Sequence, residues 1–267
     1  METKKVRLDR WIYLSFVSGV YVFLLAPLVI VVIAAFNSGK YLAFPPEGFS
    51  LKWFKNFFQS QPFMDALKVS LVLGLLTMLC ATVLGTTAGL YVVRHTRRLK
   101  NFLRLTLISP LLLPAILTGI ALLLFYYIIG IGTKTFWGLL IGHVLITFPY
   151  VFLNVYSSLY NFNRTLEEAA RSLGASQWKT FLRITLPLIK PGVISGAMFA
   201  FIVSFDQFPI SLLLKGVGRT TLPIQLFDYV RWYFDPTAAA VSTVSIAITL
   251  GVVLLTEKLV GLDSLRW

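Results

Sequence analysis

Residues 11–36 read WIYLSFVSGVYVFLLAPLVIVVIAAF, a run of 26 residues that contains no Asp, Glu, Lys, Arg or His. An α-helix rises 1.5 Å per residue, so roughly 20 apolar residues are enough to cross the hydrocarbon core of a bilayer. The run is too long for the apolar core of a signal peptide, and no small-residue cleavage pattern follows it. We therefore expect residues 11–36 to form a retained first membrane span.

Five further stretches are long and apolar enough to cross a membrane. They are residues 69–93, 105–133, 135–160, 191–214 and 237–256. Only 13% of the 267 residues are charged, against about 25% in soluble domains. We expect an all-α polytopic membrane protein with six transmembrane helices in a single transmembrane domain, residues 1–267. Pro110 and Pro114 predict a bend in the third span, because each removes a backbone donor.

The net charge of +13 is distributed unevenly over the connections. The N-terminal tail, the second and fourth connections and the C-terminal tail hold 16 of the 24 Lys and Arg residues, with a dense cluster at 94–104. Cytoplasmic loops carry an excess of Lys and Arg, so both termini are expected in the cytoplasm. Attraction to anionic lipid explains this charge better than nucleic-acid binding.

The connection at residues 164–190 has the pattern of two short helices. Thr165 and Glu168 predict a capping box at the start of the first helix. One face of that helix is apolar, because four residues recur at helical spacing: Leu166, Ala169, Ala170 and Leu173. Its small alanines make the face flat enough to enter a groove of another protein, and the alternative is that the helix rests on lipid.

The end of this unit is also marked in the sequence. Gly174 predicts the end of the first helix, because glycine readily adopts the left-handed conformation found there. Ser176 predicts the cap of the second helix, and Pro187 is expected to limit that helix.

The spacing of the loop resembles a known motif. Glu168-Ala169-Ala170 is followed by three residues, Gly174, nine residues and Ile184-x-Leu186-Pro187. This pattern is similar to the EAA loop of permease subunits in binding-protein-dependent ABC importers, and every position matches. The resemblance implies the type I ABC importer permease architecture over nearly the whole chain, in the bacterial cytoplasmic (inner) membrane.

The resemblance also implies a mechanism and partners. In the family this loop is a coupling helix that docks on a cytoplasmic ATPase, with Glu168 for capping and polar contact, Ala169, Ala170 and Leu173 at the docking face, and Gly174 as the turn. The implied partners are an ATPase dimer, a second permease subunit, and an extracytoplasmic solute-binding protein. The second permease is expected to be a different chain, and an identical copy is the alternative. The sequence contains no phosphate-binding loop, so we expect no enzymatic activity and no cofactor in this chain, with ATP and Mg²⁺ on the ATPase.

Asp206 is the one acidic residue inside the six apolar stretches. A carboxylate in a span usually faces a polar cavity or a charged partner. It either lines the substrate pathway with Gln207, Ser204, Tyr126 and Tyr150, or pairs with a basic residue of a companion subunit. His143, also in a span, is expected to be a hydrogen-bonded packing residue, since no second metal-ligating group lies near it in the sequence.

Three segments resemble the second permease of spermidine/putrescine-type importers: residues 204–208, 221–225 and 235–243. That branch commonly has two acidic residues where this chain has Asp206-Gln207. A polyamine is therefore the first expectation for the solute, with aminobutyrate, aminophosphonate and opine-like solutes as alternatives. A self-sufficient secondary transporter or channel is the alternative class, but it leaves the 164–190 loop without a role.

Overall fold

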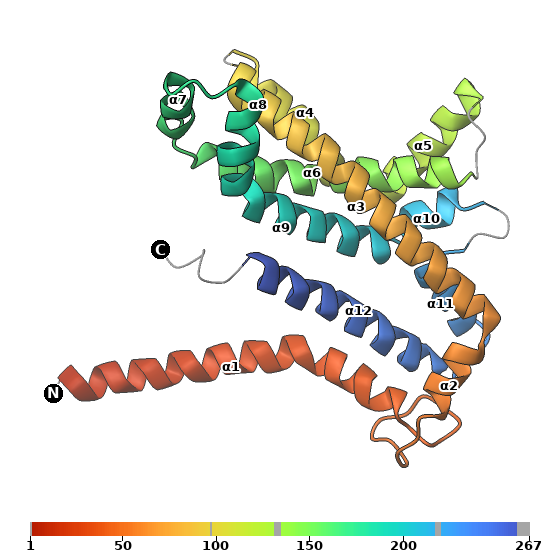
Figure 1. Ribbon diagram of the computed structural model, residues 1–267. Helices are drawn as coiled ribbons and strands as arrows, with labels where there is room; N and C mark the ends of the chain where they lie inside the picture. The colour runs from red at the N-terminus through yellow and green to blue at the C-terminus, as the bar shows by residue number, and fades with distance from the viewer. Residues whose placement is uncertain (1, 97, 131–134, 217–219, 261–267) are drawn as a thin grey trace. The chain divides into compact units, whose positions relative to one another are not determined.

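The computed structural model describes residues 2–96, 98–130, 135–216 and 220–260, and these residues are mostly helical (Figure 1). The elements are α1 (Glu2–Ala35), α2 (Lys52–Gln59), α3 (Gln61–His95), α4 (Lys100–Leu112), α5 (Ala115–Ile129), α6 (Phe136–Tyr160), α7 (Thr165–Ser172), α8 (Gln177–Thr180), the π-helix η1 (Phe181–Thr185), α9 (Leu186–Phe205), α10 (Pro209–Leu214), α11 (Leu222–Val230) and α12 (Thr237–Val260).

Five helical segments are long and apolar enough to cross a membrane, and α4 with α5 makes a sixth when this bent pair is taken as one span. The two helices meet at 101°. Leu113 is extended because a residue that precedes proline is pushed out of the helical region, and Pro114 then leads into α5. The predicted bend is confirmed; residues 131–134 of the predicted third span lie outside the described residues.

The predicted fifth span, 191–214, is wrong in its bounds. Helix runs without interruption over Gln177–Phe205, so Pro187 does not end the second loop helix. Pro187 is the second residue of α9 and directly follows the π turn η1, through which the helix continues. The helix then ends at Phe205, and α10 begins only at Pro209.

The described residues fall into two compact units. The larger comprises Asp65–Gln225 with the last part of α12, and α6 is at its centre. α6 packs against α9, α10, α5 and α4. Gly85 and Gly89 of α3 lie against Val151 and Val155 of α6, where an added Cβ would meet side-chain or backbone atoms at 2.6 and 3.0 Å. The small residues of the second span therefore serve packing within this chain.

The smaller unit comprises the residues up to Met64 and Leu226–Ile248. Its core joins the end of α1 to the start of α12 through Ala34, Ala35, Ala239 and Ala240, with Trp53 of α2 packed on them. The indole Nε1 of Trp53 donates to the carbonyl oxygen of Asn37 at 2.7 Å, which satisfies its only polar atom.

Candidate functional site

The first helix of the 164–190 loop starts differently from the prediction. Thr165 is the first residue of α7 and Arg164 occupies the N-cap without a side-chain cap. The Oδ1 of Asn163 instead accepts hydrogen bonds from the backbone N–H of Thr165 at 3.1 Å and from its hydroxyl at 2.8 Å. The capping box is therefore wrong: the N–H of Glu168, which the Thr165 side chain was expected to bind, donates to the carbonyl of Arg164 at 3.2 Å instead.

The turn after α7 is as predicted. Gly174 has a φ of +86°, its N–H donates to the carbonyl of Arg171, and the N–H of Ala175 donates to the carbonyl of Ala170. These two bonds form a Schellman motif, which favours glycine at this position. The hydroxyl of Ser176 then accepts from the N–H of Lys179 at 3.3 Å and caps α8, as expected.

The apolar face of α7 has no cover within the described part of the larger unit. Leu173 is 89% exposed and Leu166 is 47% exposed, while Ala169 is exposed and Ala170 half-buried. Trp178 at the start of α8 is also exposed. Exposed apolar side chains on a folded helix are typical of a surface that a protein partner or a membrane covers.

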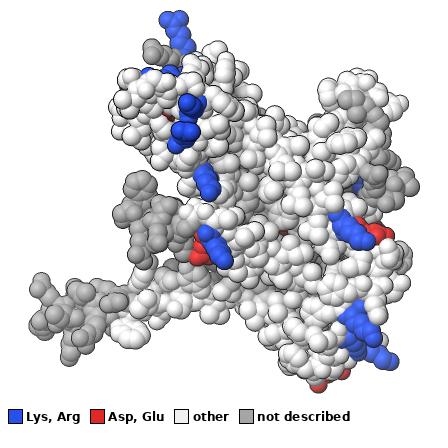
Figure 2. All heavy atoms as spheres, viewed as in Figure 1, with Lys and Arg blue, Asp and Glu red and all other residues white. Residues whose placement is uncertain are grey.

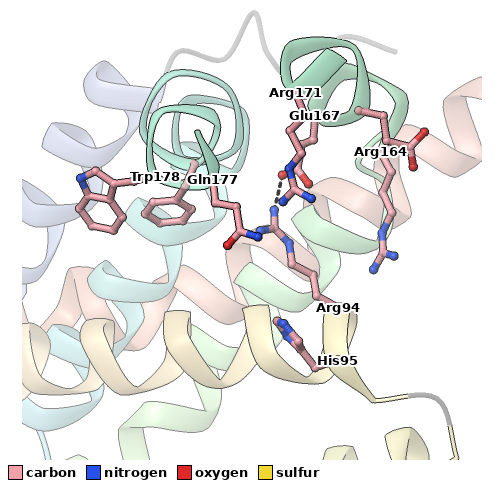
Figure 3. A pocket seen from close by; sticks show the side chains of 9 residues that line it. Arg94, His95, Arg164, Glu167, Arg171, Gln177 and Trp178 are labelled. Atoms are coloured by element: carbon pink, nitrogen blue, oxygen red, sulfur yellow. Dashed lines mark hydrogen bonds and ion pairs between the residues drawn. The ribbon is translucent and has the colours of Figure 1, made fainter. Parts of the chain in front are cut away.

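Glu167, which sequence reasoning overlooked, is the residue of α7 that holds the loop in place. It is 8% exposed, it forms an ion pair with Arg94 at the end of α3, and its carboxylate accepts a hydrogen bond from the hydroxyl of Thr185 in η1. Arg94 also donates to Thr185 Oγ1 at 3.2 Å. Figure 3 shows Arg94 reaching up from the second span to Glu167. We call these three residues the loop clamp; it joins α7 to the second span and to the helix of the fifth.

A cavity of about 560 Å³ opens beside the loop clamp (Figure 3). Charged side chains from the end of α3 and from the loop line it: Arg94, Arg164, Glu167, Glu168 and Arg171. On the face seen in Figure 2, Lys and Arg side chains lie over this end of the larger unit, and others lie at the right of the picture, away from the loop. The loop therefore offers a partner an apolar helix face bordered by a charged hollow.

The second feature of the larger unit is the break in the predicted fifth span. Asp206 is the C-cap of α9, with φ −97° and ψ 8°, and Pro209 opens α10. Asp206 is exposed, and its carboxylate makes no hydrogen bond or ion pair with another described residue. Gln207 is half-buried, and its side-chain nitrogen is buried without a hydrogen-bond partner among the described residues. The sequence placed both residues within a helix, whereas the structure places them between two helices.

The other predicted pathway residues have separate surroundings. Tyr126 is 2% exposed, and its hydroxyl donates to the carbonyl of Gly138 at 3.0 Å. Tyr150 is half-buried and stacks on Phe199 with ring centroids 6.2 Å apart. Ser204 is buried, and its hydroxyl forms a hydrogen bond with the Nδ1 of His143. In this conformation only Asp206 and Gln207 lie at the break with side-chain polar atoms unused.

His143 is a hydrogen-bonded packing residue, as predicted. It is fully buried, and its ring nitrogens lie 2.8 Å from Ser204 Oγ and 2.9 Å from Ser211 Oγ. Within the described residues no group of three His, Cys, Asp or Glu side chains is placed to hold a metal ion.

Comparisons with known proteins agree with this geometry. Residues 81–257 match the family described as binding-protein-dependent transport system inner membrane component. The chain is similar to the spermidine/putrescine transport system permease protein PotC of Haemophilus influenzae, with 30% identity over 91% of this chain and 94% of that protein. It is 36% identical to the putrescine transport system permease protein PotI of Escherichia coli, over 84% of this chain and 81% of that protein.

A solved structure shares the fold. The crystal structure of a bacterial ABC transporter involved in the import of the acidic polysaccharide alginate matches with a TM-score of 0.72 and 14% identity, over 94% of this chain and 96% of that chain. The resemblance to spermidine/putrescine-type permeases is thus confirmed. Because the family match covers most of a multi-pass helical chain, the protein belongs to the binding-protein-dependent transport system inner membrane components and is the transmembrane subunit of an ABC importer.

Proposed function

We propose that this chain forms half of the translocation pathway for a polyamine or a related small amine, and that it is driven through its 164–190 loop by a separate ATPase. The named solutes of the similar permeases, spermidine and putrescine, support an amine. Aminobutyrate, aminophosphonate and opine-like solutes carry an amino group too and remain the alternative cargo.

The observation that supports a cationic solute is the chemistry of the break at Asp206. The C-terminus of a helix carries partial negative charge, and Asp206 adds a carboxylate at the C-terminus of α9. Broken helices near the midplane are a recurring form of solute site in transporters, because their free backbone groups can contact the cargo. The exposed carboxylate would contact one ammonium group of the solute as it passes.

The coupling proposal rests on α7. Ala169, Ala170, Leu173 and Glu168 are proposed to contact the ATPase, with Gly174 setting the turn. The exposure of Leu173 and the charged cavity beside it support docking of another protein rather than burial within this chain. ATP and Mg²⁺ would be bound by the ATPase chains, since this chain carries no recognisable phosphate-binding loop.

The assembly that follows has four kinds of chain. Two ATPase subunits, a second and different permease, and an extracytoplasmic solute-binding protein would join this subunit in the bacterial cytoplasmic membrane. The excess of Lys and Arg in the even connections supports cytoplasmic termini and places the 164–190 loop on the ATPase side.

Replacing Asp206 with Asn tests the pathway role. Loss of a charge-assisted hydrogen bond, worth roughly 1.5–3 kcal/mol, should lower putrescine uptake by about tenfold or more in proteoliposomes containing the whole complex. Uptake would be measured at saturating solute-binding protein, and Asp206→Glu should retain most of the activity because the charge is kept.

Asp65→Asn is the matched control, since Asp65 is an acidic residue on α3 that lies 3.9 Å from Lys68. Normal uptake by Asp206→Asn would contradict the pathway role. Loss of the second permease during purification would show instead that Asp206 pairs with a residue of that subunit.

A further inference from the structure

We propose that His143 is a positioning residue for transport: it fixes the break in the fifth span and thereby sets where Asp206 and Gln207 present their side chains. This inference builds on the proposed function, because it assigns the element that holds the proposed amine site in place. It rests on a chain of hydrogen bonds that runs from α9 through α6 to the backbone of the break.

The donor and the acceptor of each hydrogen bond in this network follow from the bond made by Ser211. The hydroxyl of Ser211 donates to the carbonyl oxygen of Gln207 at 2.6 Å. Having used its proton, Ser211 Oγ must accept from His143 Nε2–H, at 2.9 Å. His143 Nδ1 therefore accepts from the hydroxyl of Ser204, at 2.8 Å. The assigned state is a neutral imidazole with its proton on Nε2, and all of its hydrogen-bonding capacity is used.

The two serines of this hydrogen-bond network lie on opposite sides of the break. Ser204 lies in the last turn of α9, and Ser211 lies in the first turn of α10. His143 thus forms hydrogen bonds to both sides of the break from a third helix, α6, which is the most buried of the five helical segments that are individually long and apolar enough to cross a membrane. A single rigid side chain of α6 fixes the separation of the two helix ends between which Asp206 and Gln207 lie.

Removal of the imidazole should therefore release the break without removing the packing around it. A leucine at 143 fills a similar volume but leaves Ser204 and Ser211 without their common partner. Both hydroxyls are buried. Ser204 would lose the acceptor of its hydroxyl proton and Ser211 Oγ would lose its imidazole donor, while the Ser211 hydroxyl keeps its bond to the Gln207 carbonyl. Because an unsatisfied buried polar group is costly, the two ends are expected to move until these groups find other partners. The side chain at 206 would then change its exposure.

The test measures how accessible the side chain of residue 206 is, as the rate at which a cysteine at this position is labelled. Asp206→Cys is made in a Cys80→Ser background, because Cys80 is the single cysteine of this chain and is exposed. The complete complex is labelled in nanodiscs with a fluorescent maleimide, and the rate is followed on the band of this chain. Adding His143→Leu should change the rate about fivefold or more, since losing both bonds removes roughly 1–3 kcal/mol that hold the break.

Two further variants separate positioning from general damage. His143→Gln offers an amide N–H donor for Ser211 Oγ and a carbonyl acceptor for the Ser204 hydroxyl, and should restore the rate to within about twofold. Thr147→Val removes a buried hydroxyl one turn along α6 that bonds only to carbonyls of that helix, at 2.8 Å to His143, and should leave the rate unchanged. Ser211→Ala removes the last link without altering α6 and should give a change in the same direction as His143→Leu.

The outcomes are distinct. An unchanged labelling rate in both His143→Leu and Ser211→Ala overturns the inference, whatever the solute is. An equal change in His143→Leu and Thr147→Val also overturns it, because any buried hydroxyl on α6 would then have the same effect. Failure of the amine proposal would appear elsewhere, as normal putrescine uptake by Asp206→Asn, and would leave the labelling result standing.

Discussion

Replacement of Gly174 with Pro should abolish solute uptake while ATP hydrolysis by the complex continues. Proline holds φ near −65°, whereas Gly174 has a φ of +86°, and proline also lacks the N–H that Gly174 donates to Arg171. Breaking the Schellman motif in this way should cost about 3 kcal/mol locally and reorient the exposed face of α7. We expect uptake in proteoliposomes to fall more than about tenfold, with ATPase activity within about twofold of the unaltered complex.

Gly174→Asn provides the sharp control. A Cβ added at this position would meet no atom within 4 Å, so only the backbone conformation is tested. Asparagine tolerates the left-handed region better than other residues with a side chain, so this variant should transport close to normally, and Gly174→Ala should fall between the two. Normal uptake by Gly174→Pro would show that the turn does not couple the subunits.

Arg94→Met should release α7 from the transmembrane helices. The substitution leaves the carboxylate of Glu167, which is 8% exposed, with Thr185 as its remaining partner. Removing one member of a buried ion pair costs about 3–5 kcal/mol, and the partial exposure of this pair reduces the expected cost to on the order of 2 kcal/mol. The loop should then open more often, and tryptic cleavage within residues 164–190 should become roughly tenfold faster or more.

The same variant should lose coupling, because a movement of α7 would no longer reach α3 and η1 through the loop clamp. The double variant Arg94→Met/Glu167→Gln should recover much of the resistance to trypsin, since no unpaired carboxylate is left, but not the coupling. Arg98→Met, which removes an exposed arginine four residues on, is the matched control. Equal trypsin sensitivity in Arg94→Met and Arg98→Met would contradict the role of the loop clamp.

Hydropathy and local helix signals were sufficient to predict much of this molecule. A long apolar run has few alternatives to a spanning helix, so the spans were predictable. The bend before Pro114 and the turn at Gly174 depend on backbone conformations that proline and glycine determine locally. The break after Phe205 had a local signal in Pro209, because proline has no backbone N–H to donate to a carbonyl of the preceding turn. The continuous apolar run over residues 191–214 nevertheless favoured a single helix.

Contacts between residues far apart in the chain could not be predicted from the sequence. Glu167 and Arg94 are 73 residues apart, and nothing in either neighbourhood indicates that they pair. The same holds for His143 with Ser204 and Ser211, 61 and 68 residues away. The error at Pro187 has a different origin: proline ends most helices, but here a π turn precedes it and the helix continues.

The uninterrupted helix over Gln177–Phe205 has a mechanical consequence. Its 29 residues give a rod about 43 Å long, with Thr185 of the loop clamp about 12 Å from its first residue and Asp206 just past its other end. If the rod pivots near its middle by about 10°, its ends move roughly 4 Å in opposite directions. A displacement of the Gln177 end by the proposed ATPase would therefore move the Asp206 end in the opposite direction. The proposed pathway would then narrow at one end of the helix while it widens at the other.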